Sequence, residues 1–130
     1  MAKNPVELKV DGYQDREVML VNYSFNQATD TEGQMTGIPR GGRITVRVKA
    51  LNDGNPDMLK WMTSPNLGKN GSVEFNETKT GNLMKKIEFK DGYCIDFVEH
   101  WEDKAGHWEE ITISCRALSV GPVTYENAWA

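Results

Sequence analysis

The stretch that decides the fold is residues 92–118, with the sequence GYCIDFVEHWEDKAGHWEEITISCRAL. Apolar and mostly polar side chains alternate over residues 93–98 and again over residues 111–118. Because successive strand residues point to opposite faces, each run offers one apolar face. Residues 102–106 between them are polar, short and contain a glycine, as a hairpin loop requires. The pattern predicts two long antiparallel strands joined as a hairpin.

The apolar residues of both strands carry odd numbers, so facing pairs must sum to an even number if both apolar sets cover one core. A register shift by one residue would expose the apolar side chains of one strand to water, so registers whose pairs sum to an odd number are costly. The pairs that this register predicts are Phe97 with Ile111, Ile95 with Ile113, Tyr93 with Cys115, His100 with Trp108 and Asp96 with Thr112. It also places Cys94 and Cys115 on opposite faces, so we expect no disulfide between them. Reduced thiols are typical of a cytoplasmic protein.

Shorter alternating runs before and after the hairpin predict the other strands. They cover residues 6–10, 16–25, 43–50, 72–76, 84–89 and 123–129, with a turn at residues 90–92 that leads into the hairpin. Many short strands separated by turn residues are typical of a β-sandwich or a β-barrel. The sequence therefore predicts a single, mainly β domain over residues 1–130, in which two antiparallel sheets pack together.

One short helix is expected at about residues 56–63. Asn55 can cap its amino end, Pro56 suits the first helical position, and Asp57 places an acid in the first turn. The residues expected on its packed face are Met58, Leu59 and Met62, with Trp61 at the border. A helix this short needs packing against the sheet to be stable.

Composition and charge exclude several classes of function. The chain has 130 residues and a formal net charge of -4, from 15 Lys and Arg against 19 Asp and Glu. No basic cluster exceeds Lys85-Lys86, which argues against nucleic acid or an anionic membrane surface as a partner. No run is long and apolar enough to span a membrane, and the first residues lack the apolar region of a signal peptide. We therefore expect neither membrane insertion nor nucleic-acid binding.

Histidine and cysteine residues offer two weak candidates for chemistry. His100 and His107 could form a metal site with nearby acids, but spacing alone does not supply ligand geometry, and two solvent-facing histidines are the simpler interpretation. Cys94 beside His100 could act as a nucleophile, but a small buried residue is simpler. The glycines of residues 33–42 match no phosphate-binding motif. We expect no catalytic residue, no metal and no cofactor, and hence no enzyme.

Three features suggest interaction surfaces. Residues 26–42 form a long Gly- and Pro-rich connection, which is either functional or a solvated loop. Both faces of the 16–25 strand are apolar near residues 19–21, which suggests that something besides the core covers it. The outward side chains of the 43–50 strand include Arg43, Arg47 and Lys49. That cationic row is either an ordinary solvated face or the lining of an interface or channel.

The order and spacing of these parts resemble a known family over essentially the whole chain. An early strand ends in NYSF (22–25), a Gly- and Pro-rich loop returns through GGRI (41–44), and the short helix follows. Then come DGYCIDF (91–97), ITISCRAL (111–118) and VTYENAW (123–129). This pattern resembles the tube protein of type VI secretion systems, the Hcp or TssD family, in its Bacteroidetes form.

The resemblance implies a compact Hcp-like β-barrel with one helix on its side, assembled as hexameric rings that stack into a hollow tube. The partners that it implies are further copies of the chain, the sheath, spike and baseplate proteins of the secretion machine, and effector cargo in the lumen. It implies no catalysis and no cofactor. Such a subunit is in the bacterial cytoplasm when assembled and reaches the outside or a target cell on firing, without a signal peptide.

The resemblance also assigns roles to the three surface features. The loop that reaches the next ring would present Asp30, Glu32, Gln34, Met35, Ile38 and Arg40. The lateral contact between neighbouring subunits would bury Met19, Val21 and Tyr23. Candidates for the lumen wall are Arg43, Arg47 and Lys49 on the cationic row, and Asp57 and Lys60 on the helix.

Three alternatives stay open at this point. The chain could be the tail-tube protein of a phage or of an extracellular contractile injector, which sequence does not separate from a secretion tube. It could also be a small monomeric ligand-binding β-barrel, which predicts an enclosed apolar cavity. The third alternative is a hydrolase that uses Cys94 and His100, which predicts that these side chains share a pocket.

Overall fold

Seven strands and one helix are seen in the computed structural model, which describes residues 5–26, 31–32, 34, 40–51, 54–64, 67–77, 79–80, 82–104 and 106–126. In chain order they are β1 (Val6–Val10), β2 (Arg16–Asn26), β3 (Arg40–Lys49), α1 (Asp57–Thr63), β4 (Lys69–Asn76), β5 (Leu83–Glu102), β6 (Gly106–Val120) and β7 (Val123–Glu126). Most bounds lie within a few residues of the predicted ones. The predicted end of the last strand, residues 127–129, lies outside the described residues.

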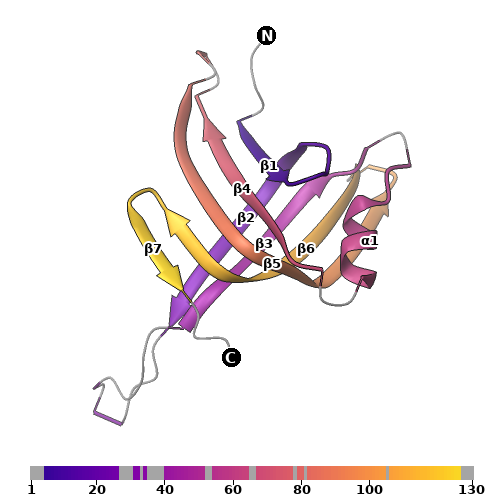
Figure 1. The fold of residues 1–130 in the computed structure, drawn as a ribbon. Helices are drawn as coiled ribbons and strands as arrows, with labels where there is room; N and C mark the ends of the chain where they lie inside the picture. The colour runs from indigo at the N-terminus through magenta and orange to yellow at the C-terminus, as the bar shows by residue number, and fades with distance from the viewer. Residues whose placement is uncertain are drawn as a thin grey trace.

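The seven strands form one sheet in the order β3-β2-β1-β4-β5-β6-β7, and β3 also pairs with β6 (Figure 1). This extra pairing closes six strands into a barrel. One edge of β6 serves two neighbours, because residues 108–114 pair with β3 and residues 117–120 pair with β7. The prediction of a β-barrel with one short helix is confirmed. The two packed antiparallel sheets that the sequence predicts are opposite walls of one closed sheet.

Alternating apolar side chains from the strands fill the interior of the barrel. Those at most 1% exposed include Leu8, Ile44, Val46, Val48, Val73, Ile87, Phe89, Ile111, Ile113 and Leu118. Fully burying a side chain of this size contributes about 1.5–3 kcal/mol. The alternation on which the strand predictions depended therefore also supplies the core.

Helix α1 packs on β5 and contributes Met58 and Trp61 to the core, each 1% exposed. The Trp61 ring stacks on Phe89 with centroids 6.4 Å apart, and its Nε1 donates to the Leu67 carbonyl oxygen at 2.9 Å. Leu59 is 46% exposed, so the predicted packed face is wrong at this position. Residues three apart share a helix face, which places Trp61 beside Met58 and turns Leu59 away.

The hairpin of β5 and β6 has the predicted register only in its outer half. Phe97 pairs with Ile111, and His100 pairs with Trp108, as expected. A bulge between Cys94 and Asp96 then shifts the register by one residue, so that Cys94 pairs with Ile113. The predicted pairs of Ile95 with Ile113 and of Tyr93 with Cys115 are wrong, because Tyr93 faces Ser114 and Gly92 faces Cys115.

Close packing around Gly92 gives the physical reason for this shift. A Cβ atom at Gly92 would lie 2.7 Å from Phe89 Cδ2 and 2.8 Å from Ile113 Cγ2. The inward position opposite Cys115 therefore has room only for glycine, and the bulge follows two residues later, after Cys94. As a result Ile95, which the simple alternation turns inward, is 39% exposed.

Both cysteines consequently lie on the core side of the hairpin. Cys94 is 8% exposed and Cys115 is 0% exposed, and neither thiol forms a disulfide. The expectation that they occupy opposite faces is wrong, because the bulge reverses the alternation at Cys94. Burial raises the pKa of the Cys94 thiol to about 11 and the pKa of the Cys115 thiol to about 12.

The predicted turn at residues 90–92 is wrong, because β5 runs without interruption from Leu83 to Glu102. Asp91 has a positive φ of 50° and accommodates the bend inside the strand. The pairing with β4 shifts at the same place, between Lys69 and Gly71. The strand expected at residues 84–89 and the first strand of the hairpin are therefore one bent strand, which forms part of two hairpins.

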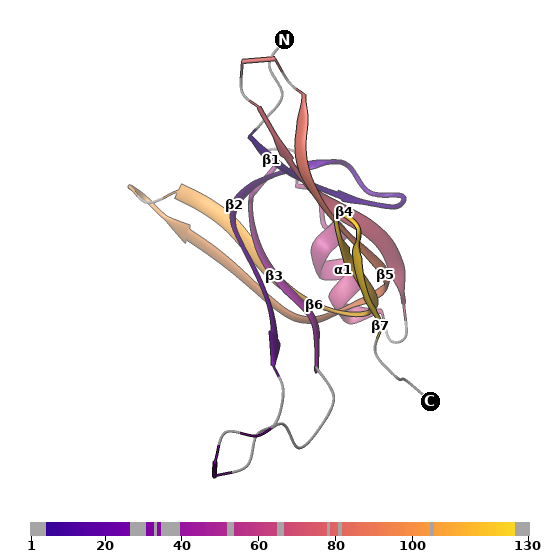
Figure 2. The same cartoon turned by 90° about the vertical axis from the view of Figure 1, so that its left-hand side faces the viewer.

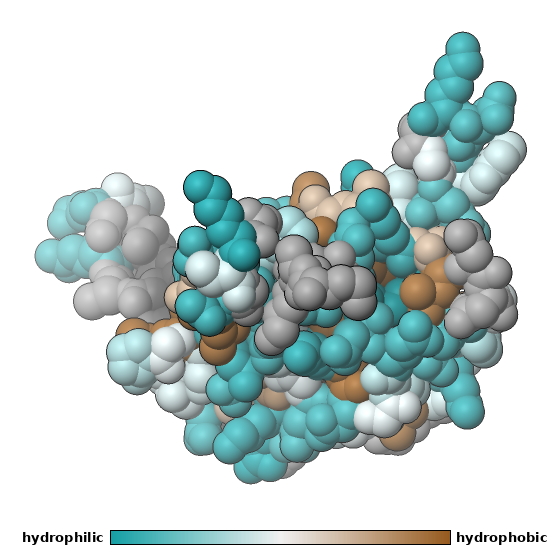
Figure 3. All heavy atoms as spheres, turned by 90° about the horizontal axis from the view of Figure 1, so that it is seen from above, coloured by the Kyte–Doolittle hydropathy of each residue, from teal (hydrophilic) through white to brown (hydrophobic). Residues whose placement is uncertain are grey.

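Both hairpins of β5 extend beyond the barrel (Figure 2). The tip of the β5–β6 hairpin projects to the left in this view, and the tip of the β4–β5 hairpin projects upward. Both tips lie away from the lower end of the barrel, where β2 ends at Asn26 and β3 begins at Arg40. Seen from above, the described surface is largely hydrophilic, with apolar residues in small separate patches (Figure 3).

Candidate interaction surfaces

The outward side of β2, β3, β6 and β5 forms one continuous surface, which we call the outer wall. Its strands are in register, so outward residues make rows across four strands. One row is Asn22, Thr45, Thr112 and Asp96, and the next is Leu20, Arg47, Glu110 and Val98. The hydroxyls of Thr45 and Thr112 lie 3.4 Å apart. The outer wall is therefore an ordered surface of mixed polarity.

The predicted cationic row lies on this wall, but two of its charges are compensated. Arg47 donates to Glu110 Oε2 from Nε at 3.2 Å and from Nη2 at 3.0 Å. Lys49 Nζ lies 2.8 Å from Glu17 Oε2. Arg43 is exposed between Ser24 of β2 and Ser114 of β6. The outward direction of the row is confirmed.

A stack of three side chains stiffens the wall where the β5–β6 hairpin leaves the barrel. The Arg47 guanidinium lies 4.0 Å from the centroid of the Trp108 ring. The His100 ring stacks on the same indole, with centroids 4.7 Å apart and planes 20° apart. Because Arg47, Trp108 and His100 come from three strands, the stack holds the base of the hairpin to β3.

The other two lumen candidates lie elsewhere on the molecule. Asp57 and Lys60 belong to α1, which packs on β5 rather than on β3. The Asp57 N–H donates to Asn55 Oδ1 at 2.8 Å, but the N-cap residue is Pro56, one position later than the sequence predicts. The structure brings Arg43, Arg47 and Lys49 together and separates them from the helix residues.

The residues predicted for a lateral contact are only partly available at the surface. A bulge between Val18 and Leu20 changes the alternation along β2. Val21 and Tyr23 pair with inward residues of β3 and pack against the core, so their expected outward direction is wrong. Met19 is 46% exposed and Leu20 is 38% exposed. The exposed apolar surface of β2 is therefore Met19 and Leu20.

The residues predicted for the ring-stacking loop fall mostly outside the described part of the chain. Glu32 and Gln34 are exposed, and the backbone of Arg40 begins β3. Asp30, Met35 and Ile38 lie outside the described residues. Their predicted role stays a prediction.

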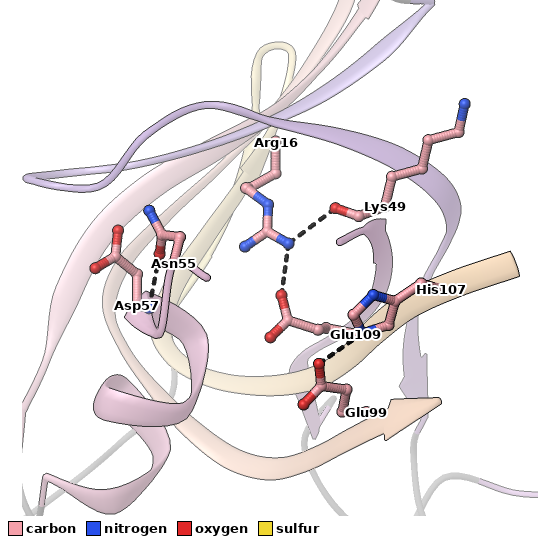
Figure 4. Close-up of polar contacts among 7 residues, drawn as sticks. All are labelled: Arg16, Lys49, Asn55, Asp57, Glu99, His107 and Glu109. Atoms are coloured by element: carbon pink, nitrogen blue, oxygen red, sulfur yellow. Dashed lines mark hydrogen bonds and ion pairs between the residues drawn. The ribbon is translucent and has the colours of Figure 1, made fainter. Parts of the chain in front are cut away.

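A buried ion pair closes the end of the barrel near α1 (Figure 4). Arg16, which is 2% exposed, donates from Nη2 to Glu109 Oε1 at 2.5 Å and to the Lys49 carbonyl oxygen at 2.8 Å. Sequence reasoning missed this pair, although Glu109 continues the inward odd-numbered series of Ile111, Ile113 and Cys115. An acid in an inward series is the signal that could have indicated a buried cationic partner.

A pocket of about 190 Å³ lies beside this pair, between the start of α1 and the β5–β6 hairpin. Its lining includes Leu51, Leu59 and Glu109, together with His107 and Glu99, whose Nε2 and Oε2 atoms lie 2.7 Å apart. His107 and Glu109 are each engaged by another side chain. The arrangement joins elements together and presents no activated nucleophile.

Among the described residues, the structure does not provide the geometry that the metal-site and nucleophile hypotheses require. Cys94 faces the core and donates from Sγ to the Asp96 carbonyl oxygen at 3.4 Å. His100 lies on the outer wall against Trp108, so these two side chains are on opposite faces of β5. Within the described ranges, no group of His, Cys, Asp and Glu is placed to hold a metal ion. In the same ranges, no helix has the length and apolar character needed to cross a membrane.

Comparison with known proteins places this geometry among relatives. The sequence model of the family described as hemolysin coregulated protein Hcp (TssD) matches residues 3–130. The chain is similar to Hcp1 from Flavobacterium johnsoniae, with 30% identity, 94% of this chain and 98% of that chain covered, and a TM-score of 0.86. No curated protein sequence gives a significant match.

Two more distant structures share the fold. Hcp1 from the E. coli EAEC 042 pathovar is 14% identical, with 98% of this chain and 100% of that chain covered and a TM-score of 0.75. A type VI secretion system effector from Yersinia pestis is 12% identical, with 94% and 99% covered and a TM-score of 0.73. Together with the match over residues 3–130, these similarities show that the chain belongs to the hemolysin coregulated protein Hcp (TssD) family.

Proposed function

We propose that this chain is a structural subunit of the inner tube of a type VI secretion system. Copies form hexameric rings, the rings stack into a hollow tube, and a contractile sheath propels the tube. The observation that carries this proposal is the family match over residues 3–130, on a barrel that superposes on Hcp1 from Flavobacterium johnsoniae with a TM-score of 0.86. The function requires contacts between copies rather than catalysis.

Two open strand edges support a lateral contact of the kind that a ring needs. β2 pairs with β1 only at Arg16 and Glu17, so one edge of β2 from Val18 onward has no strand beside it among the described residues. β5 pairs with β4 only as far as Gly92, so residues 93–102 have β6 as their one neighbour in that part of the chain. The outer wall thus has an open edge on each side.

Placing the β2 edge of one copy beside the β5 edge of the next would continue the wall. The four strands of the wall alternate in direction, so β2 and β5 would meet as antiparallel neighbours. Two different edges make a heterologous contact, which closes into a ring when the rotation allows. Met19 and Leu20, exposed on β2, would be covered at this seam.

The outer wall would then face the lumen. Its rows are polar or charge-compensated, as in the pairs Thr45 with Thr112 and Arg47 with Glu110. Such a surface can carry effector cargo without binding it strongly. In this arrangement Arg43, Arg47 and Lys49 line the channel and the α1 residues Asp57 and Lys60 do not. Residues of the 26–42 loop, with Glu32 and Gln34 among them, would contact the next ring.

The cellular partners follow from this role. The subunit would contact the sheath, spike and baseplate proteins, and effectors would travel in its lumen. It would be in the cytoplasm when assembled and outside the cell after firing. A phage-like injector would use the same contacts between copies. Export that is lost in a strain without the sheath gene of the secretion system would support the type VI tube over the phage-like injector.

Imaging of the purified protein tests the proposal. Six copies of a 14.7 kDa chain give a mass of about 88 kDa by light scattering, and negative-stain images should show rings. A chain that remains monomeric over a wide range of protein and salt concentrations refutes the tube function.

Site-directed labelling tests the orientation of the wall. Thr112→Cys coupled to a bulky maleimide should add density at the centre of the ring, because the native thiols are buried. Lys60→Cys on α1 is the matched control and should add density elsewhere. A label on residue 112 that appears at the outer rim overturns the assignment of the lumen.

A further inference from the structure

Two hairpin tips carry opposite charges. The tip of the β5–β6 hairpin, residues 99–107, holds Glu99, Glu102 and Asp103 against Lys104, a net charge of -2 with neutral histidines. We call it the acidic arm. The tip of the β4–β5 hairpin, residues 77–86, holds three lysines against one glutamate, a net charge of +2. We call it the basic arm. Lys86 is already paired with Glu74 and Glu88, at 3.9 and 3.6 Å, so the complementarity with the acidic arm rests on Lys79 and Lys85.

Each arm also exposes large apolar side chains. Trp101 on the acidic arm is 67% exposed. Leu83 and Met84 on the basic arm are 52% and 69% exposed. Side chains of this kind, and tryptophan above all, are typical anchors of protein interfaces when charged groups surround them.

Local contacts hold both arms in shape. On the acidic arm, His107 Nε2 lies 2.7 Å from Glu99 Oε2, and the base is fixed by the stack of His100 on Trp108. On the basic arm, the Glu77 N–H donates to the Asn82 carbonyl oxygen at 2.8 Å, which closes the turn. Arms that are ordered before contact lose less entropy on association.

The positions of the arms suit a contact between copies related by a rotation. The basic arm projects from the upper end of the barrel and the acidic arm from its left-hand side, both away from the lower end where β2 and β3 lead into the loop (Figure 2). They project in different directions, one sideways and one upward in that view. Each copy therefore offers one arm of each charge, and the two arms point in different directions.

We propose that the acidic arm of one copy and the basic arm of the next form a head-to-tail contact. Leu83 and Met84 pack on Trp101, while Lys79 faces Glu102 and Asp103. Because the two surfaces differ, each copy makes the contact twice, once with each arm. Opposite charges speed the encounter, and the apolar anchors supply the affinity. This inference rests on the tube function and names one pair of surfaces that joins the copies.

Single variants test whether each arm is needed for assembly. Trp101→Lys on the acidic arm and Met84→Glu on the basic arm should each raise the protein concentration for half-assembly at least tenfold, because each buries a charge against apolar anchors. Val123→Ser is the control, since Val123 is 67% exposed on β7, outside both arms and outside the outer wall. It should assemble like the wild type, and all variants should keep the wild-type circular dichroism.

Combining the changes tests whether the two residues meet. A chain with both Trp101→Lys and Met84→Glu should assemble better than either single variant, because lysine and glutamate then face each other. If both single variants form rings as readily as the wild type, the proposed contact is wrong and the tube function is unaffected. A double variant no better than the weaker single variant also overturns it. A wild-type chain that forms no rings refutes the tube function itself.

Discussion

Replacing Arg16 with methionine tests what closes the barrel end near α1. Arg16 is 2% exposed and Glu109 is 5% exposed, so neither charge is well solvated. Arg16→Met would leave the Glu109 carboxylate buried without its cation. Removing one partner of a buried pair costs about 3–5 kcal/mol. Because a domain has a total stability of roughly 5–15 kcal/mol, this change should remove a large part of it.

Urea unfolding followed by circular dichroism, at one fixed protein concentration, measures the effect. With a slope of about 1–3 kcal/mol per M for urea, the midpoint should fall by roughly 1 M or more. Arg47→Met is the matched control, because the Arg47–Glu110 pair is about 30% exposed on both sides. Breaking this partly exposed pair and its contact with the Trp108 ring should together cost about 1–2 kcal/mol, which is less than the loss of the buried pair.

A double variant with methionine at both Arg16 and Glu109 separates pairing from packing. Since replacing both members of a buried pair with apolar residues is often neutral, the double variant should be more stable than Arg16→Met alone. The reasoning is refuted if Arg16→Met loses no more stability than Arg47→Met, or if the effects of the two buried changes simply add.

Three further predictions follow from the core. Gly92→Ala should destabilise the fold by about 1–3 kcal/mol, because the added Cβ would meet Phe89 and Ile113, and an unchanged melting temperature would contradict this. Trp61→Ala should cost about 3–5 kcal/mol in urea unfolding, whereas Leu59→Ala on the exposed side of α1 should cost far less. Burial raises the pKa of the Cys94 and Cys115 thiols from the ordinary 9.0 to about 11 and about 12. Because the thiols of the unfolded chain lose their protons at lower pH than those of the folded chain, the stability of the fold should decrease as the pH rises from about 9 toward 11. Cys115→Ala should flatten that fall, and a thiol reagent at pH 8 should modify neither cysteine before unfolding.

Much of the fold could be predicted because alternation is a local signal. Ile44, Val46 and Val48 are inward on β3 as the sequence indicates, and the helix starts at Asp57, whose N–H donates to the Asn55 side chain. The outer half of the β5–β6 register also follows from parity alone. These features depend on neighbours in sequence, so no knowledge of the rest of the barrel is needed.

The errors occur where a distant neighbour decides the local geometry. The shift at Cys94 depends on the lack of space at Gly92 beneath Phe89, which only the folded barrel reveals. The pair of Arg16 with Glu109 joins residues 93 positions apart. Sequence could indicate that Glu109 lies inward, but not which cation reaches it. Residue types alone do not encode these packing details.

The same irregularities decide which surfaces remain for assembly. A strictly alternating β2 would have placed Val21 and Tyr23 outward, but its bulge turns them to the core and leaves Met19 and Leu20 exposed. A bulge on an open strand edge also limits pairing with unintended strands. A subunit that must join its own copies needs an edge that accepts one partner and resists others. The bulge therefore explains why Val21 and Tyr23 turn inward, and under the proposed ring contact it would make β2 a selective seam.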